Sequence, residues 1–579
     1  MNALKYILST ISLATMAAGV ISCVRAHAAE ENQNGVFKYR EIYLPEGTGE
    51  SAEELGLNTV DNDWGIWGHN LAIVLPDDPS ESIYAKRKDG SKAKSQFCFS
   101  SERLYEYIED YIDKKYDDDE HIRFAIIPND NDIVCVDAEC VKAGNTVHDA
   151  SPAIFNLINR LAKRFPKHLF FTSHYRTTKS LPTDTMPGNT GVLISAINYP
   201  LSPTPTAQEQ EFLHLLRSWD QKTDNILVWD YINNFDDYFT PYPIFEVMQH
   251  RLQNYAENGV TAIFMNGSGT DYSSFSDLKA GVLSDLTINP DTDWRESLRK
   301  HAMKHYPVSG ETIVDFIIAQ EEYLSSVGKP LPLYEGVEAA SKLYLPKDEF
   351  IAFHDKLLQL RKDASGKERE NLDRVAGALA LTRLELNRID GNLQNTEELL
   401  ADLNGLQKFD IPYYNEASWS VDHYVRDYNR LLKYYNENNG KNKLKGKRLE
   451  ALTPLDPEYS DITILTDGML GLPSNYHSGN LITSPDQATR IAIPNTGDYK
   501  HLQVGLVYNP AYRISLPAEV ELRVGGKIVK SITPDYPADN SGHLFLDFDL
   551  PGGNQGTAVL TFYKDPDTHS MAIDEIEAW

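Results

Sequence analysis

Short apolar runs alternate with helical patterns over the first half of the chain. The apolar runs are typical of buried strands and lie at Phe37–Tyr43, Trp64–His69, Ile122–Ile127, Leu169–Ser173, Gly191–Ile197, Asn225–Tyr231 and Val260–Asn266. Apolar residues with helical spacing lie between them, at Ser101–Lys115, Ser151–Phe165, Ala207–Trp219 and Ile244–Asn258. This alternation predicts a parallel sheet, and seven strands favour a (β/α)8-type barrel, with one strand unrecognised or missing, over a doubly wound sheet.

The pattern changes twice after this predicted barrel, which covers residues 37–305. Residues 306–450 carry apolar positions three and four apart and predict a helical domain, with helices at Ile313–Leu324, Lys347–Lys362 and Lys367–Ile389. The polar, lysine-rich stretch Asn436–Arg448 is typical of a solvated linker. Residues 455–579 predict a β-sandwich, with strands at Ile462–Leu465, Thr489–Ile493, Leu502–Tyr508, Val520–Val524, Leu544–Leu550 and Thr557–Tyr563.

The first 29 residues predict a signal peptide. Lys5 precedes an apolar stretch, Tyr6–Val20, that is too short and too weakly apolar to span a membrane in the mature protein. The sequence VISC at residues 20–23 resembles a bacterial lipobox, which would leave Cys23 as a lipidated N-terminus. The sequence AHA at residues 26–28 offers an ordinary signal-peptidase site. We favour the lipoprotein, so the protein is expected in the periplasm or on the cell surface, held to the membrane only by lipid.

Charge and motifs exclude several classes of function. The formal net charge of −29 disfavours nucleic acid and anionic membrane as partners. No helix opens with a G-x-G-x-x-G or Walker pattern, which counts against a nucleotide-binding fold, and no G-x-S-x-G motif supports serine hydrolysis. The spacing of histidines and carboxylates matches no metalloenzyme motif. We therefore predict neither a cofactor nor a metal, and the sequence does not indicate the oligomeric state.

Three cysteines remain if Cys23 is used for lipidation. They are Cys98, Cys135 and Cys140, an odd number that allows one disulfide and one free thiol in an oxidising compartment. A single C-x4-C pair is a weak zinc signal. A local disulfide or packed thiols are therefore favoured.

The candidate chemistry lies where predicted strands end. Asn129, Asp130 and Asp132 follow a buried strand, at the end where parallel α/β folds place reacting groups. Asp130 is the predicted catalytic carboxyl group, with Asp132 in reserve, although a turn would also use these residues. Asp230 could be the partner carboxylate, a hydroxyl ligand or a buried structural residue.

Other residues at or just past the strand ends are predicted to bind substrate. Tryptophan faces stack on sugar rings, and the polar side chains hydrogen-bond to hydroxyl groups, although each could equally be structural. The candidates are Trp67, His69, Asn129, His174, Tyr175, Arg176, Trp229, Tyr231 and Asn266.

Several ordered motifs resemble one bacterial family. They read FKYRE from residue 37, DNDWGIWGH from 61, QFCFS from 96, PNDNDIVCVDAEC from 128, VWDYINNFDDYFTPYP from 228 and GVTAIFMNGSG from 259. Together they resemble the family called domain of unknown function 4838, which overlaps glycoside hydrolase family 163. The C-terminal LTDG and MAIDEIEAW segments resemble galactose-binding-like sandwiches.

The resemblance implies a (β/α)8 barrel that acts on glycans, with retaining hydrolysis directed at N-acetylhexosamines. By analogy with acetamide-assisted enzymes, Asn129 and Asp130 would serve the reaction. Two features depart from the family. Its members usually carry a small α/β domain before the barrel, whereas this chain enters the predicted barrel almost directly after its signal peptide. Their cysteine cluster often reads C-x-C-x-x-C, whereas Asp137 stands at the middle position here. A glycoside hydrolase and a non-catalytic glycan-binding lipoprotein therefore both stay open, each with an oligosaccharide or polysaccharide as partner.

Overall fold

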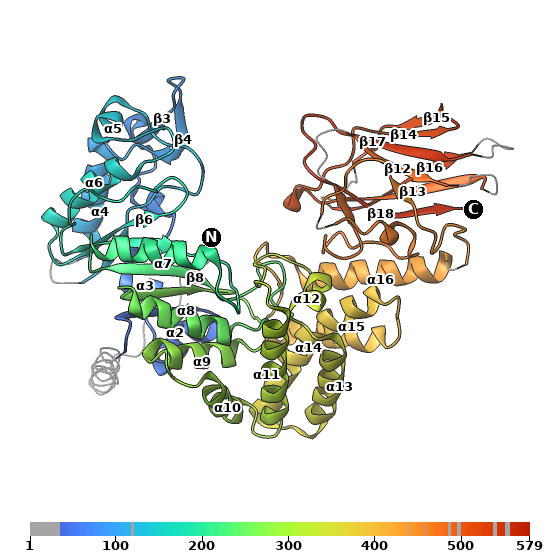
Figure 1. Ribbon diagram of the computed structural model, residues 1–579, viewed down its shortest axis with the longest axis horizontal. Coiled ribbons are helices and arrows are strands. Elements are labelled where there is room, and N and C mark those ends of the chain that lie inside the picture. The colour runs from blue at the N-terminus through green and yellow to red at the C-terminus, as the bar shows by residue number, and fades with distance from the viewer. Residues whose placement is uncertain are drawn as a thin grey trace, which may run out of the picture. The chain divides into compact units, whose positions relative to one another are not determined.

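The computed structural model divides the chain into two compact units (Figure 1). It describes residues 35–116, 121–438, 440–457, 459–483, 488–494, 499–536, 541–550 and 556–579. The first unit contains the described residues up to Asn233, together with Pro243–Thr270 and Phe275–Leu331. The second contains Asn234–Tyr242, Asp271–Ser274 and Pro332–Trp579. Cys23 lies outside the described residues.

The first unit is built on a curled parallel sheet of seven strands in the order β1-β9-β8-β7-β6-β5-β2. The strands are β1 (Tyr39–Tyr43), β2 (Trp64–Ile66), β5 (Arg123–Ala125), β6 (Leu169–His174), β7 (Thr190–Ser195), β8 (Ile226–Tyr231) and β9 (Ala262–Asn266). β1 and β2 are the two edges, and the remaining strands follow one another in chain order between them. This is an incomplete (β/α)8-type barrel, so the predicted fold class is confirmed.

Helices follow most of the strands because each apolar stripe packs back onto the sheet, although β6 and β7 are joined by a loop. They include α4 (Glu102–Lys115), α5 (Ala138–Ala143), α6 (Ser151–Arg164), α7 (Ala207–Asp220), α8 (Phe245–Glu257) and α9 (Ser276–Ile288). Ser101 caps α4, and Thr206 forms a capping box with Glu209 at the start of α7. α10 (Trp294–His305) and α11 (Gly310–Val327) complete the unit.

Short elements precede β5. They are η1 (Pro45–Gly47), α2 (Gly49–Glu54), α3 (Val60–Asp63), η2 (Leu71–Val74) and η3 (Glu81–Ile83). The antiparallel hairpin β3 (Tyr84–Lys86) and β4 (Lys92–Phe97) was not predicted from the sequence. It matters for the site because residues at the end of β4 contact the loop after β5.

The second unit combines helices with a β-sandwich. Its helices are α12 (Val337–Leu343), α13 (Lys347–Asp363), α14 (Gly366–Ile389), α15 (Thr396–Asn404), η4 (Gly405–Phe409) and α16 (Val421–Asn438). α14 packs against both α13 and α15, which explains why most of its residues are buried. Among the described residues, no helix is long and apolar enough to cross a membrane.

The sandwich consists of two antiparallel sheets in the orders β10-β12-β17-β14-β15 and β11-β18-β13-β16. The strands are β10 (Glu450–Ala451), β11 (Leu481–Thr483), β12 (Thr489–Ile493), β13 (His501–Tyr508), β14 (Glu519–Val524), β15 (Lys527–Ile532), β16 (Gly542–Asp549), β17 (Ala558–Tyr563) and β18 (Met571–Ala578), with η7 (Pro510–Tyr512) between β13 and β14. Inward-facing residues of both sheets form one core, as expected for a sandwich.

Two predictions in this unit were wrong. Ile462–Leu465 is not a strand but lies in the 3-10 helix η5 (Ile462–Thr466), because Asp461 accepts a hydrogen bond from the Thr463 amide and starts a turn. The stretch Asn436–Arg448 is not a solvated linker. Leu444 is fully buried in the sandwich core, and the Asn442 amide donates a hydrogen bond to Glu575. A leucine and an asparagine among lysines were enough to anchor this segment.

Candidate functional site

Alternation along the parallel strands decides which side chains face the concave side of the sheet. Successive residues of a strand point to opposite faces. One set forms an aromatic-rich core inside the curl, with members from all seven strands or the residues that follow them: Tyr39, Trp64, Ala125, Ile127, Phe171, Leu193, Leu227, Ala262 and Phe264. Trp67 and Trp229 pack against this core and are only partly buried. The carboxyl ends of the strands therefore meet around an aromatic surface.

The two tryptophans form a flat stack. The ring centroids of Trp67 and Trp229 are 5.1 Å apart, with an angle of 5° between the ring planes. Phe264 supports both rings from the core, at centroid distances of 4.7 Å and 4.5 Å. Because the rings are fixed by neighbours and partly exposed, they can present an aromatic face to a ligand at little cost in side-chain entropy.

Hydroxyl groups border this aromatic surface. Tyr231 follows Trp229 by two residues on β8 and shares its face, and its hydroxyl lies 3.4 Å from that of Ser195 at the end of β7. Burial raises the pKa of Tyr231 to about 12, so the phenol keeps its proton and can donate it. Asn266 ends β9, two residues after Phe264, and is only partly buried.

An arginine joins the two carboxylates of the loop that follows β5. Arg176 donates from Nη1 to Asp130 Oδ1 at 2.8 Å and from Nε to Asp132 Oδ1 at 2.7 Å. Hydrogen bonds from Arg176 lower the pKa of Asp132. Arg176 has a φ of 46°, a backbone conformation that costs energy for a residue with a Cβ.

Asp130 is the more enclosed of the two carboxylates. Its side chain is 48% exposed, against 81% for Asp132. Burial, followed by the charge of Asp130, raises the pKa of Tyr175. Asp130 therefore lies beside a protonated phenol, whereas Asp132 points mainly into water.

The loop that carries Asp130 is held by the end of β4. The Gln96 amide donates to the Asn129 carbonyl at 3.0 Å and to Asn131 Oδ1 at 3.1 Å, while Gln96 Oε1 accepts from the Asn129 amide at 3.1 Å. Asn129 also donates from its side chain to the Ser95 carbonyl. The Asn129 side chain thus ties down the loop instead of pointing freely toward a ligand.

His69 lies at the rim of the same face. Its Nδ1 is 2.6 Å from the Pro128 carbonyl, which can only accept, so that nitrogen is the donor. The ring centroid is 6.2 Å from that of Tyr175. The described structure therefore places Trp67, His69, Asp130, Tyr175, Arg176, Trp229, Tyr231 and Asn266 on or beside one face.

Asp230 faces the opposite way, toward the helices. Its carboxylate is fully buried, pairs with Arg251 of α8 and accepts a hydrogen bond of 2.5 Å from the Tyr255 hydroxyl. Arg251 also lies over the ring of Tyr199, 3.8 Å from its centroid. This is the arrangement of a structural ion pair that fastens α8 to the sheet. We therefore leave Asp230 out of the proposed reacting groups.

His174 also faces the helices. Its ring packs edge-on against Trp219 of α7 at a centroid distance of 5.9 Å. Burial lowers its pKa to about 4, so the ring is neutral at physiological pH. Its position between β6 and α7 is that of a packing residue and not of a ligand.

Sequence reasoning missed Ser195, Tyr43 and Gln96. Ser195 and Tyr43 end β7 and β1 on the concave face, two residues after Leu193 and Glu41. Strand alternation was the signal that could have found them. Gln96 carried no such signal, because its role depends on the hairpin that brings β4 to the loop after β5.

A comparison with protein families agrees with the motifs. Residues 72–317 match the family described as domain of unknown function (DUF4838), which confirms the resemblance inferred above. No curated protein matches the chain.

Among solved structures, the chain is similar to a family GH115 4-O-methyl-α-glucuronidase described as specific for decorated arabinogalactans. The identity is 12% and the TM-score 0.37, over 92% of this chain and 72% of that one. A GH138 enzyme described as targeting pectin rhamnogalacturonan II shares 9% identity with a TM-score of 0.27, over 86% of this chain and 78% of that one. A fucose-binding module from Streptococcus pneumoniae shares 18% identity with a TM-score of 0.18, over 24% of this chain and 94% of that one. Likeness at this level transfers no activity to this chain.

Proposed function

We propose that the concave face of the parallel sheet binds a glycan and that Asp130 acts in hydrolysis of its glycosidic bond. The observation that carries the proposal is the placement of a fixed tryptophan surface beside a carboxylate. Trp67 and Trp229 supply the surface, and Asp130 with Arg176 supplies the charged group at the same strand ends. In parallel α/β barrels this end is where substrates react.

The composition of the face suits a sugar ring. The apolar C–H face of a pyranose packs on a flat aromatic ring, and its hydroxyl groups need donors and acceptors around the edge. Tyr231 and Ser195 offer hydroxyls, and Asn266 offers an amide. The proposed partner is therefore an oligosaccharide or polysaccharide.

Glycoside hydrolysis needs an acid for the leaving oxygen and a second group that stabilises the positively charged ring carbon. Asp130 is the proposed acid. Asp230 was the expected second carboxylate, but it is paired with Arg251 on the helix side. With Asp230 in a structural role, we propose that the substrate's own acetamide is the second group, as the family resemblance implies, so an N-acetylhexosamine is the proposed sugar beside Asp130.

One observation favours a second candidate, a glycan-binding protein without activity. Arg176 pairs with both Asp130 and Asp132, so both carboxylates of the loop already have a partner. Such an ion pair would suit hydrogen bonding to sugar hydroxyls without proton transfer. In either case we propose an exported protein, anchored through Cys23 in the periplasm or at the cell surface.

Release of reducing sugar from a panel of host and plant glycans separates the two candidates. Hydrolysis predicts release from glycans that contain an N-acetylhexosamine, and loss of that release in Asp130→Asn. Binding without hydrolysis predicts no release from any glycan but retention of the protein on a glycan array. A protein that neither cleaves nor binds any member of the panel would contradict both.

A further inference from the structure

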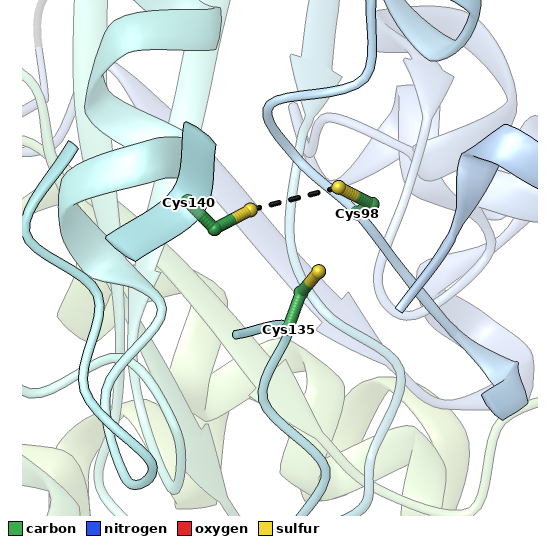
Figure 2. Close-up of side chains that lie close together, drawn as sticks. All are labelled: Cys98, Cys135 and Cys140. Atoms are coloured by element: carbon green, nitrogen blue, oxygen red, sulfur yellow. Dashed lines mark hydrogen bonds between the residues drawn. The ribbon is translucent and has the colours of Figure 1, made fainter. Parts of the chain in front are cut away.

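Three cysteines meet inside the first unit. Cys98 follows β4, Cys135 lies in the loop after β5, and Cys140 is in α5. All three are buried, and their sulfur atoms lie within 4.8 Å of one another. Figure 2 shows the three sulfurs directed toward a common point from three separate segments. The sequence favoured a local disulfide or packed thiols here, and no metal.

The distance between two of the sulfur atoms fits shared binding of a metal ion better than a disulfide bond. Cys98 and Cys140 have their sulfurs 3.6 Å apart, whereas a disulfide bond is about 2.05 Å long. Two thiolates on one tetrahedral zinc ion, with zinc–sulfur bonds of about 2.3 Å, are about 3.8 Å apart. The observed separation is close to the zinc value. A disulfide between any two of them would also leave the third thiol buried without that partner.

The surroundings hold Cys135 and Cys98 in place. The Lys86 amide donates to Cys135 Sγ at 3.3 Å, the kind of hydrogen bond that stabilises a metal-bound thiolate. Asn145 donates from its side chain to the Cys135 carbonyl at 3.2 Å and accepts from the Ala153 amide of α6. The Cys98 amide donates to the Ile83 carbonyl at 2.7 Å. The cysteines are thus held by neighbouring backbone, as a preformed site requires.

We propose that Cys98, Cys135 and Cys140 bind one zinc ion as three thiolate ligands, with a water molecule as the fourth. Three sulfur donors in a buried cluster select a soft or borderline ion such as Zn²⁺ over Mg²⁺ or Ca²⁺. Binding displaces the three thiol protons to solvent, so no oxidant or reductant is needed.

The ion would stabilise the loop that carries Asp130. Cys98 is two residues after Gln96, whose side chain binds Asn129 and the neighbouring Asn131. Cys135 closes the other end of the same loop. A zinc ion that joins Cys98 to Cys135 would hold β4 against this loop and fasten both to α5. This role is independent of which ligand the aromatic face binds.

The test measures metal content in the full-length chain, purified under reducing conditions without metal-affinity chromatography. A Cys23→Ala background leaves only the three clustered thiols. After incubation with Zn²⁺ and desalting, elemental analysis should find one zinc per chain. Replacing Zn²⁺ with Co²⁺ should give the near-ultraviolet thiolate-to-cobalt absorption, and Mg²⁺ should not compete.

Cys135→Ser should lose the tightly held zinc, whereas Asp132→Asn, on the same loop, should keep it. A chelator should lower the thermal midpoint of the parent protein, and Zn²⁺ should restore it. This second measurement does not depend on the folding of the serine variant. Parent protein that retains no zinc after reduction, or whose midpoint is indifferent to chelator and zinc, would overturn the proposal.

Discussion

The buried ion pair with Arg251 gives Asp230 a structural role. Both side chains are almost completely inaccessible, and Tyr255 donates a further hydrogen bond to the same carboxylate. A buried charge that loses its partner costs far more than an exposed one, because the remaining ion is left without water or counter-ion. Asp230 is thus expected to matter for stability, and Asp132, which lies in water, is not.

Asp230→Asn should lower the free energy of unfolding of the first unit by about 3–5 kcal/mol, since it leaves the Arg251 guanidinium buried and unpaired. Urea denaturation followed by tryptophan fluorescence measures this loss. Asp132→Asn is the matched control and should show no measurable change. A stability of Asp230→Asn equal to that of the parent would mean that the ion pair is absent in solution.

Strand alternation explains which site predictions succeeded. Trp229 and Tyr231 are two residues apart and share the concave face, so Asp230 between them must face the helices. The same argument separates Tyr175 from His174. Strand alternation could not place Asp130, because Asp130 lies beyond the regular part of β5. Its pairing with Arg176 depends on a loop conformation with positive φ that the sequence did not indicate.

At the scale of elements, Glu321 of α11 links two helices. It is fully buried and accepts a hydrogen bond of 2.7 Å from the Phe245 amide at the start of α8. Burial raises its pKa from 4.5 to about 8. The folded protein therefore keeps a proton on Glu321 at pH values where the unfolded chain has lost it.

This pKa difference predicts a pH dependence of stability. Between pH values of about 4.5 and 8, the contribution of Glu321 should fall as pH rises, by up to about 1.4 kcal/mol per pH unit. Glu321→Gln keeps an acceptor for the Phe245 amide but cannot ionise. Unfolding free energies of parent and variant, measured across this range, should diverge with rising pH in favour of the variant. A difference that is constant with pH would contradict the buried, protonated carboxyl group.

Most elements of the first unit could be predicted because its strands are short apolar runs between clear helical patterns. The β3–β4 hairpin could not, since β4 is largely polar: KAKSQF has only Ala93, Gln96 and Phe97 buried. The segment around Leu444 was missed for a similar reason. One buried leucine among exposed lysines gives no periodicity to detect.

At the scale of the whole molecule, the core of the β-sandwich includes residues that precede the predicted sandwich boundary at residue 455. Leu444 and Leu449 belong to the sandwich core, and Asp427 of α16 accepts a hydrogen bond from the Ser474 amide. Removing the residues before 455 therefore takes away core and polar contacts together. The exact domain limits remain a prediction.

A fragment of residues 421–579 should be more stable than one of residues 455–579. Loss of each buried leucine costs about 2–5 kcal/mol, which is a large part of the free energy of unfolding of a typical domain. Thermal unfolding monitored by circular dichroism compares the two fragments. Equal midpoints would show that Leu444 and Leu449 do not contribute to the core.

Attachment to the membrane is a separate prediction, since Cys23 lies outside the described residues. Two acyl chains on a lipidated N-terminal cysteine give stable anchoring where one does not. Cys23→Ala expressed in a bacterium should appear in the soluble fraction or as an uncleaved precursor, as judged by fractionation and mass. Membrane retention of this variant as a processed form would contradict the lipobox.

The most direct test of the proposed site compares the turnover of Asp130→Asn with that of Asp132→Asn on the best glycan of the panel. A general acid contributes typically about 10²- to 10⁴-fold to the rate, so Asp130→Asn should lose at least about 10²-fold in kcat while KM changes little. Asp132→Asn should lose far less, and both variants should keep the thermal midpoint of the parent. Normal turnover by a stable Asp130→Asn protein would contradict the account.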